Sequence, residues 1–165
     1  MISEAYKEQQ KELHNRGQYG IQGKHYAESV KNLAEALKTH DILDYGCGQR
    51  TLEKEIGFLI RNYDPCIEEF SEPPQLPADI VVCTDVLEHI EPEHIDAVLD
   101  DLKRLTRKFG FFVVATGPAQ KTLADGRNAH LIQESANWWL PKIMSRFRLK
   151  QFQAVGQSFI VVVKP

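Results

Sequence analysis

Apolar residues occur in two patterns along the chain, and the two predict different elements. Unbroken apolar runs rich in β-branched residues, such as 78–83, are typical of strands that are buried on both faces of a sheet. Gly156 separates the last two runs, which predicts an antiparallel pair at the end. The strands expected from these runs begin or lie at 41–43, 58–65, 78–83, 111–116, 151–155 and 158–163.

Spaced apolar stripes predict helices between these strands. One stripe has spacings of four, three and four residues and predicts an amphipathic helix over 25–40. A second stripe follows Pro92, a residue favoured in the first turn of a helix, and continues to about Lys108. Further helices are expected at 3–14, from Thr51 as N-cap, and at 130–147, where Pro141 disturbs the pattern.

The alternation of strands and helices predicts an α/β fold. We expect a Rossmann-like three-layer sandwich with a mostly parallel sheet and an antiparallel terminal strand. Only thirteen residues separate Asp64 from Ala78, and this segment is rich in proline, so it is too short for a helix and another strand. The sheet is therefore expected to have one strand fewer than usual. Residues 1–165 are expected to form a single domain, with 1–23 as a surface lead-in or a flap hinged at Gly17, Gly20 and Gly23.

Composition narrows the class of protein. The 165 residues are 42% hydrophobic, and no apolar run approaches the roughly 20 residues of a membrane span. The polar start of the chain does not resemble a secretory signal, and three cysteines without a Cys-x-x-Cys pair favour a reducing cytoplasm. A net charge of -3 gives no general attraction to phosphate backbones. We therefore expect a cytoplasmic protein that binds neither membranes nor nucleic acids.

The run 44–48, which reads Asp-Tyr-Gly-Cys-Gly, is the first candidate for chemistry. It follows the buried residues Ile42 and Leu43 and precedes a predicted helix. Glycine allows a sharp turn with positive φ and lets a ligand approach the backbone. Ligands of open α/β sheets bind at the carboxyl ends of the strands, where this turn lies. Strand, acid, glycine turn and helix together predict a nucleotide-type site, although a Gly-x-Gly alone also fits an ordinary β-turn.

Asp64 ends the second expected strand, 20 residues after Asp44. In a Rossmann-type unit an acid at about this distance is placed to bind ribose hydroxyls. The alternative is an aspartate that caps a helix or closes a turn.

The order of these motifs resembles the class I S-adenosylmethionine-dependent methyltransferases, with small-molecule O-methyltransferases closest in pattern. The resemblance rests on 42–48, Tyr63-Asp64-Pro65, 78–83, the Asp-Val-Leu-Glu-His run at 85–89 and the closing strand pair. It implies S-adenosylmethionine as cofactor and methyl transfer to a small-molecule acceptor, at a hydroxyl oxygen for example. The residues that it assigns to the cofactor are Asp44, Gly46, Cys47, Gly48, Asp64, Thr84 and Asp85.

Two features depart from that family. Many relatives carry a third glycine where Arg50 stands, and the short segment after Asp64 lacks the strand that commonly supplies an acid to adenine. Backbone groups of 66–70 are candidates to replace that acid. Two other functions stay open: a non-catalytic S-adenosylmethionine-binding module and a metal-dependent RNA 2′-O-methyltransferase.

His130 is the candidate catalytic residue. It follows an irregular segment that leaves a strand end on the side where an acceptor enters, and a histidine suits a base that takes a proton from oxygen. The alternative is a histidine at a helix N-terminus without a chemical role.

Asp85, Glu88 and His89 share one face if they lie on a helix, with His130 as a possible fourth ligand of a divalent ion. Similar residues bind metal in some relatives and pack without metal in others, and from the sequence we expect no metal.

Overall fold

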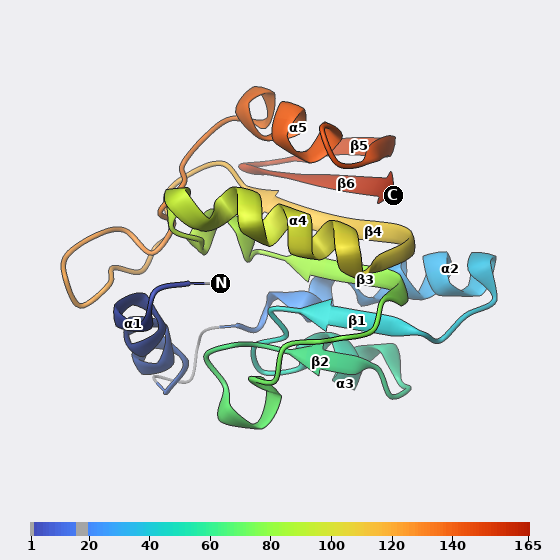
Figure 1. The fold of residues 1–165 in the computed structure, drawn as a ribbon, viewed down its shortest axis with the longest axis horizontal. Coiled ribbons are helices and arrows are strands. Elements are labelled where there is room, and N and C mark those ends of the chain that lie inside the picture. Colours follow the sequence, from blue (N-terminus) through green and yellow to red (C-terminus); the bar gives the residue numbers. More distant parts are fainter. Residues whose placement is uncertain (1, 16–19) are drawn as a thin grey trace.

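The computed structural model describes residues 2–15 and 20–165, so Gly17 of the predicted flap lies outside the described part (Figure 1). The architecture is a six-stranded sheet with the order β2-β1-β3-β4-β6-β5. Its strands are β1 (Ile42–Tyr45), β2 (Arg61–Tyr63), β3 (Ala78–Thr84), β4 (Thr106–Ala115), β5 (Arg148–Val155) and β6 (Ser158–Lys164).

The strand directions agree with the prediction. β1 pairs in parallel with β2 and β3, and β3 pairs in parallel with β4. β6 then runs antiparallel between β4 and β5. The described segment 64–77, between β2 and β3, contains only the 3-10 turn Glu68–Phe70. This confirms the smaller sheet expected from the proline-rich segment.

Helices cover both faces of the sheet (Figure 1). α2 (Ala27–Leu37) and α3 (Thr51–Ile56) pack on one face, and α4 (Ile95–Leu105) and α5 (Ala136–Met144) pack on the other. β3 contributes to both cores, because Val81 faces α4 and α5 while Ile80 and Val82 face α2 and α3. The observed fold is therefore the three-layer sandwich that the apolar runs predict.

Several predicted boundaries were wrong. β2 has three residues and does not begin at 58, and β4 begins at Thr106 rather than at 111. The helix expected over 25–40 is divided into the 3-10 turn Gln22–Tyr26 and α2, which ends where Lys38 adopts a left-handed conformation. The helix that follows Pro92 begins with the 3-10 turn Pro92–His94 and ends at Leu105.

The cap of α3 also differs from the prediction. Arg50, and not Thr51, is the N-cap residue, and its φ of 55° lies in the left-handed region. Arg50 thus has the backbone conformation that glycine adopts most easily, at the position where many relatives carry their third glycine. Its guanidinium lies 4.8 Å from the ring centroid of Phe70.

The last helix is much shorter than predicted. α5 begins at Ala136, because the preceding residues bond to other parts of the chain and not to a helical ladder. The backbone N–H of Ile132 donates to the carbonyl of Glu88, and the ring of His130 contacts the carbonyl of Gly117. The segment from His130 to Ser135 is consequently held as a loop.

The helix α1 (Glu4–Asn15) lies beside the carboxyl ends of the parallel strands (Figure 1). Ser3, just before it, binds the carboxylate of Glu91 through its backbone N–H and its hydroxyl, both at 2.7 Å. Tyr6 is buried against Leu123 and Ala129. α1 and the irregular loop before α5 therefore pack on each other. Within 2–15 and 20–165, no helix has the length and apolarity needed to cross a bilayer.

Candidate active site

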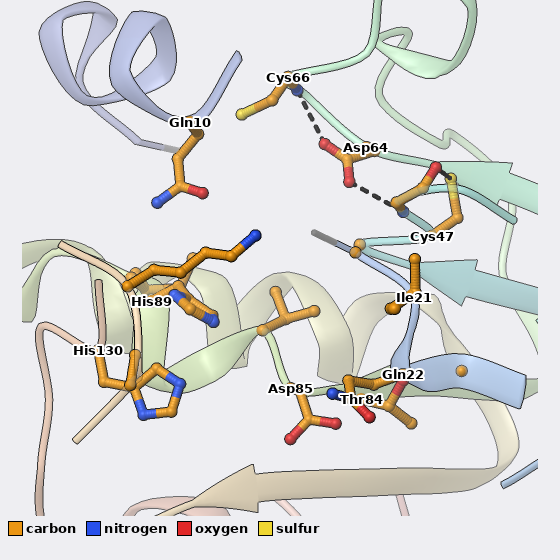
Figure 2. Close-up of a pocket in the computed structure, with 18 of the residues that line it drawn as sticks. Gln10, Ile21, Gln22, Cys47, Asp64, Cys66, Thr84, Asp85, His89 and His130 are labelled. Carbon is orange, nitrogen blue, oxygen red and sulfur yellow. Dashed lines mark hydrogen bonds between the residues drawn. The ribbon is translucent and has the colours of Figure 1, made fainter. Parts of the chain in front are cut away.

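A cavity of about 410 Å³ opens at the carboxyl ends of β1, β2 and β3 (Figure 2). The loops after these strands form its floor, as expected for an open α/β sheet. Its lining includes every residue that the family resemblance assigns to the cofactor, together with His130: Asp44, Gly46, Cys47, Gly48, Asp64, Thr84, Asp85 and His130.

The two glycines of the turn after β1 occupy positions with no space for a side chain. Gly46 and Gly48 have φ angles of 81° and 49°, which L side chains rarely adopt. A Cβ on Gly46 would lie 2.3 Å from a methyl carbon of Val86, and one on Gly48 would lie 2.5 Å from the carbonyl oxygen of Gly20. The turn therefore needs glycine at both positions.

Asp64 connects the two loops that border the cavity on one side. Its Oδ2 accepts a hydrogen bond from the backbone N–H of Gly48 at 3.1 Å, and its Oδ1 accepts one from the N–H of Cys66 at 2.9 Å (Figure 2). The residue is 6% exposed. Asp64 thus fixes the position of the glycine turn relative to β2 in addition to facing the cavity.

Asp44 is the buried acid at the end of β1. Burial, followed by the negative charges of Asp64 and Glu53, raises the pKa of Asp44 to about 7. A cation next to such a carboxyl would stabilise its ionised form and lower its pKa again. Asp44 is therefore suited to recognise a positively charged group of a ligand.

Thr84 is the last residue of β3, and Asp85 comes directly after it. Asp85 has a φ of 53°, a left-handed conformation that is strained for a residue other than glycine. Its backbone N–H donates to the carbonyl of Val113 on β4, which holds this conformation in place. Burial raises the pKa of its carboxyl. The strain occurs at a residue that lines the cavity, which is a common feature of functional sites.

Cys47 lies within the glycine turn and lines the cavity. Burial raises the pKa of its thiol well above the ordinary value, with further contributions from the charges of Asp44 and Asp64. A thiol in such surroundings is a poor nucleophile. Cys47 therefore contributes shape to the cavity and not reactivity.

His130 does not begin a helix, so the alternative interpretation as a helix-terminal histidine was wrong. Its Nδ1 lies 2.7 Å from the carbonyl oxygen of Gly117, and its backbone N–H donates to Asn128 at 2.9 Å. These contacts hold the ring in the cavity wall, beside the ring of His89 (Figure 2). Nδ1 is occupied by the carbonyl, so Nε2 is the nitrogen that remains for chemistry.

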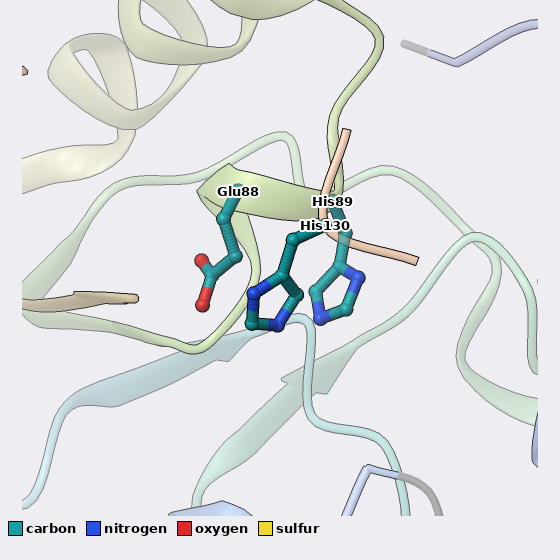
Figure 3. A group of neighbouring side chains, drawn as sticks. All are labelled: Glu88, His89 and His130. Carbon is teal, nitrogen blue, oxygen red and sulfur yellow. The ribbon is translucent and has the colours of Figure 1, made fainter. Parts of the chain in front are cut away.

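Glu88, His89 and His130 form a compact cluster (Figure 3). One ligand atom from each residue lies within 4.8 Å of the other two. The sequence interpretation placed Asp85 with Glu88 and His89 on one helix face, but 87–89 is a single 3-10 turn and Asp85 does not belong to this cluster. His130, from a distant loop, occupies the third place instead.

The sequence interpretation missed other lining residues. Ile2, Tyr6 and Gln10 line the cavity from the N-terminal segment, and Lys121 does so from the loop before α5. In the sequence, only the predicted flap in 1–23 indicated that the N-terminal segment could border the cavity. Next to it, an adjoining hollow of about 770 Å³ is bordered by Arg50, 65–71 and part of α1.

Comparison with known proteins identifies the family. A family model described as a methyltransferase domain matches residues 17–157. The chain belongs to this methyltransferase family. No curated protein sequence matches the methyltransferase at a significant level.

Solved structures share the fold of this methyltransferase at low sequence identity. The 1,6-didemethyltoxoflavin-N1-methyltransferase of Burkholderia thailandensis, solved with 1,6-didemethyltoxoflavin and S-adenosylhomocysteine, is 13% identical with a TM-score of 0.63 and covers 87% of this chain and 78% of its own. The magnesium protoporphyrin IX methyltransferase of Synechocystis is 16% identical with a TM-score of 0.63, and the match covers 88% of this chain and 85% of that protein. DhpI, solved in complex with S-adenosylhomocysteine, is 13% identical with a TM-score of 0.62, and the match covers 99% of this chain and 98% of DhpI.

Proposed function

We propose that the protein is an S-adenosylmethionine-dependent methyltransferase that methylates a hydroxyl oxygen of a small molecule. The observation that carries this proposal is the position of two sets of residues in one cavity. The glycine turn, Asp44 and Asp64 line one side, and His89 and His130 line another. The first set suits a nucleoside with a charged amino-acid tail, and the second suits an acceptor.

The proposed cofactor position follows from the chemistry of each wall. The backbone of Gly46 and Gly48 allows close approach of the cofactor, and Asp44 suits its ammonium group. Asp64 lies where ribose hydroxyls would be bound. Since 64–77 lacks the strand that commonly supplies an acid to adenine, we propose that the backbone after Asp64 binds the base. Cys66 borders both the cavity and the adjoining hollow, in agreement with this position.

A small acceptor fits the size of the cavity. Its volume of about 410 Å³ lies in the lower part of the range for small-molecule sites. Residues of α1 line it in addition to the strand ends, so the cofactor and a compact acceptor would leave little room for a polymer. A ligand that enters or leaves the cavity would therefore pass α1 or the loop before α5.

Methyl transfer requires little from the protein beyond orientation. The bond between the methyl carbon and the sulfonium sulfur breaks, a carbon–oxygen bond forms, and the hydroxyl proton is released. A bound geometry that aligns the acceptor with the methyl group supplies much of the rate. A neutral hydroxyl also needs activation, and His130 is the residue that we propose for it, because its ring is held in the cavity wall by Gly117.

The test begins with cofactor binding and continues with transfer. Calorimetry should give a dissociation constant in the micromolar range for S-adenosylhomocysteine and no binding of NAD. Isotope-labelled S-adenosylmethionine is then incubated with a panel of small phenols, hydroxy acids, amines and thiols, and with a short RNA. Labelled O-methyl products from the hydroxyl compounds support the proposal.

The remaining outcomes of this test contradict the proposal. Transfer to RNA alone, or to amines alone, would refute the acceptor class. Binding of S-adenosylhomocysteine without transfer to any compound would favour a non-catalytic binding module. Tight NAD binding without any response to S-adenosylhomocysteine would refute the cofactor.

A further inference from the structure

The cluster of Glu88, His89 and His130 has a buried acid that the fold itself leaves incompletely satisfied. Glu88 is 0% exposed, and one of its carboxylate oxygens, Oε1, accepts a hydrogen bond from the backbone N–H of Ala115 at 3.0 Å. The other oxygen, Oε2, is buried and has no hydrogen-bond partner among the described residues. A buried carboxylate oxygen without a partner is costly, so its retention needs a reason.

Both imidazoles of the cluster are oriented by backbone carbonyls. Nδ1 of His89 lies 2.7 Å from the carbonyl oxygen of Ala129, and Nδ1 of His130 lies 2.7 Å from that of Gly117. A carbonyl can only accept, so each Nδ1 carries the proton and each Nε2 is the basic nitrogen. Histidines that bind metals are held in this way, with the second ring nitrogen donating to a carbonyl.

The two rings lie edge to face, with centroids 4.7 Å apart and an interplanar angle of 81°. Figure 3 shows them next to each other, with Glu88 beside the ring of His130. Segments remote in the sequence thus bring two imidazoles to the wall of the cavity, with the buried carboxyl of Glu88 behind them in the same cluster.

The geometry points to a site for a divalent transition-metal ion, held by the carboxylate of Glu88 and the imidazoles of His89 and His130. Two imidazole nitrogens and one carboxylate oxygen favour an ion such as Zn²⁺ over Mn²⁺, Mg²⁺ or Ca²⁺, which prefer oxygen ligands. This proposal replaces the expectation from the sequence that the site holds no metal.

The spacing of the cluster fits an ion after a small adjustment. Ligand atoms that share an ion at about 2.1 Å each cannot be more than about 4.2 Å apart. The ligand atoms here lie within 4.8 Å of one another, so the widest pair needs to close by roughly half an ångström. The Glu88 side chain can contribute to this adjustment, because its Oε2 makes no hydrogen bond to the described residues that would have to be broken.

This site deepens the proposed function and rests on it. Three protein ligands leave coordination positions open for an acceptor, as in catalytic metal sites. The ion would lower the pKa of a hydroxyl bound to it, and the proton would leave to water before methyl transfer. His130 then activates the acceptor as a ligand of the ion and not as a free base.

Metal binding itself is the test, because it needs no acceptor. Protein without an affinity tag is treated with chelator, dialysed and titrated with Zn²⁺, Mn²⁺ and Mg²⁺ by calorimetry. We expect one equivalent of Zn²⁺ to bind, with Mn²⁺ and Mg²⁺ each at least tenfold weaker. Co²⁺ should produce visible absorption bands typical of nitrogen and oxygen ligands.

Variants locate the site. Glu88→Gln, which keeps an acceptor for Ala115, and His130→Gln should each weaken Zn²⁺ binding at least tenfold. His25→Gln, in an exposed 3-10 turn outside the cluster, should leave it unchanged. Binding of S-adenosylhomocysteine to each variant reports that the protein is folded.

Two results would overturn the site. One is the absence of stoichiometric binding by protein that still binds S-adenosylhomocysteine, and the other is binding that Glu88→Gln and His130→Gln leave intact. Either result leaves the proposed methyl transfer standing, whereas failure to bind S-adenosylhomocysteine refutes the proposed function even if the ion binds.

Discussion

The carboxylate of Asp64 accepts a hydrogen bond from the backbone N–H of Gly48 at 3.1 Å, across two loops that follow neighbouring strands. Its second oxygen accepts from Cys66 at 2.9 Å. One side chain therefore sets the distance between the glycine turn and the loop after β2, and it also lines the cavity. A change at Asp64 should consequently affect both the stability of the protein and the proposed cofactor site.

Asp64→Ala removes both acceptors and leaves the two backbone N–H groups without their partner. We expect a loss of about 1–3 kcal/mol in the free energy of unfolding, measured with urea, and a similar loss in the binding of S-adenosylhomocysteine by calorimetry. Glu35→Ala is a suitable control, because Glu35 is exposed on α2 and lies outside the cavity. An unchanged affinity in Asp64→Ala would remove Asp64 from the cofactor site.

Gly48→Ala tests the close approach of the turn to the backbone of Gly20. The new Cβ would lie 2.5 Å from a carbonyl oxygen, in addition to the strain of a left-handed residue. Gly126→Ala is the matched control, because Gly126 also has positive φ but has nothing within 4 Å of the new Cβ. We expect Gly126→Ala to cost about 1 kcal/mol and Gly48→Ala clearly more, with loss of S-adenosylhomocysteine binding. Equal melting temperatures would contradict the tight packing at Gly48.

The proposed cofactor side of the cavity consists of residues whose position at one edge of the sheet could be predicted, because local sequence determines it. Asp44 and Gly48 are separated by a few residues, and their spacing fixes a turn at a strand end. Asp64 ends the next strand of a parallel pair, and parallel strands place their carboxyl ends at the same edge. Hydrophobic pattern and spacing were enough to place these residues.

The acceptor side depends on contacts between remote segments, which a single sequence does not encode in its spacing. Ser3 binds Glu91 across 88 positions, and His89 contacts Ala129 across 40. The prediction of a helix from His130 failed for the same reason, because its ring is held by Gly117. Local periodicity was overridden there by tertiary hydrogen bonds.

The pair of Ser3 and Glu91 should hold α1 over the cavity. Ser3→Ala removes the hydroxyl contact of 2.7 Å and keeps the backbone contact, whereas Glu91→Gln removes the charge that strengthens both. We expect faster amide exchange in α1 and faster dissociation of S-adenosylhomocysteine, in the order wild type, Ser3→Ala, Glu91→Gln. Ser145→Ala removes a comparable hydroxyl contact, to the carbonyl of Lys142 at the end of α5 and outside the cavity, and should change neither rate. Unchanged exchange in both variants would show that α1 is held by other contacts.

His130→Ala should separate cofactor binding from catalysis. The ring lies beside His89 and away from the glycine turn, so the affinity for S-adenosylhomocysteine should stay within about twofold (Figure 2). Turnover with a hydroxyl acceptor should fall by roughly 10²-fold or more, the range for a lost activating group. His25→Ala, at an exposed position, provides the control. A variant that loses only stability and keeps its rate would show that His130 has a structural role alone.

Asp44→Asn should stabilise the unliganded protein in a manner that depends on pH. Burial and the charges of Asp64 and Glu53 raise the pKa of Asp44 to about 7 from an unfolded value of 3.8, so the folded state favours the protonated carboxyl. Below pH 4 that carboxyl is neutral in both states, and the variant and the wild type should have similar stability. As the pH rises from 4 to 7, ionisation in the unfolded state lowers the stability of the wild type relative to the variant, by at most about 4 kcal/mol above pH 7.

Urea unfolding of Asp44→Asn and wild type at pH 4, 6 and 8 measures this difference directly. Asp85 and Glu88 also have raised pKa values through burial, but both proteins contain them, so their contributions cancel to first order in the comparison. The same substitution should weaken S-adenosylhomocysteine binding at pH 8, because the ammonium group loses its anion. In the wild type, affinity should fall as the pH drops below 7, where the unliganded Asp44 becomes protonated. Parallel stability curves for the two proteins would show that Asp44 ionises like an exposed carboxyl, and the proposed contact with the ammonium group would lose its basis.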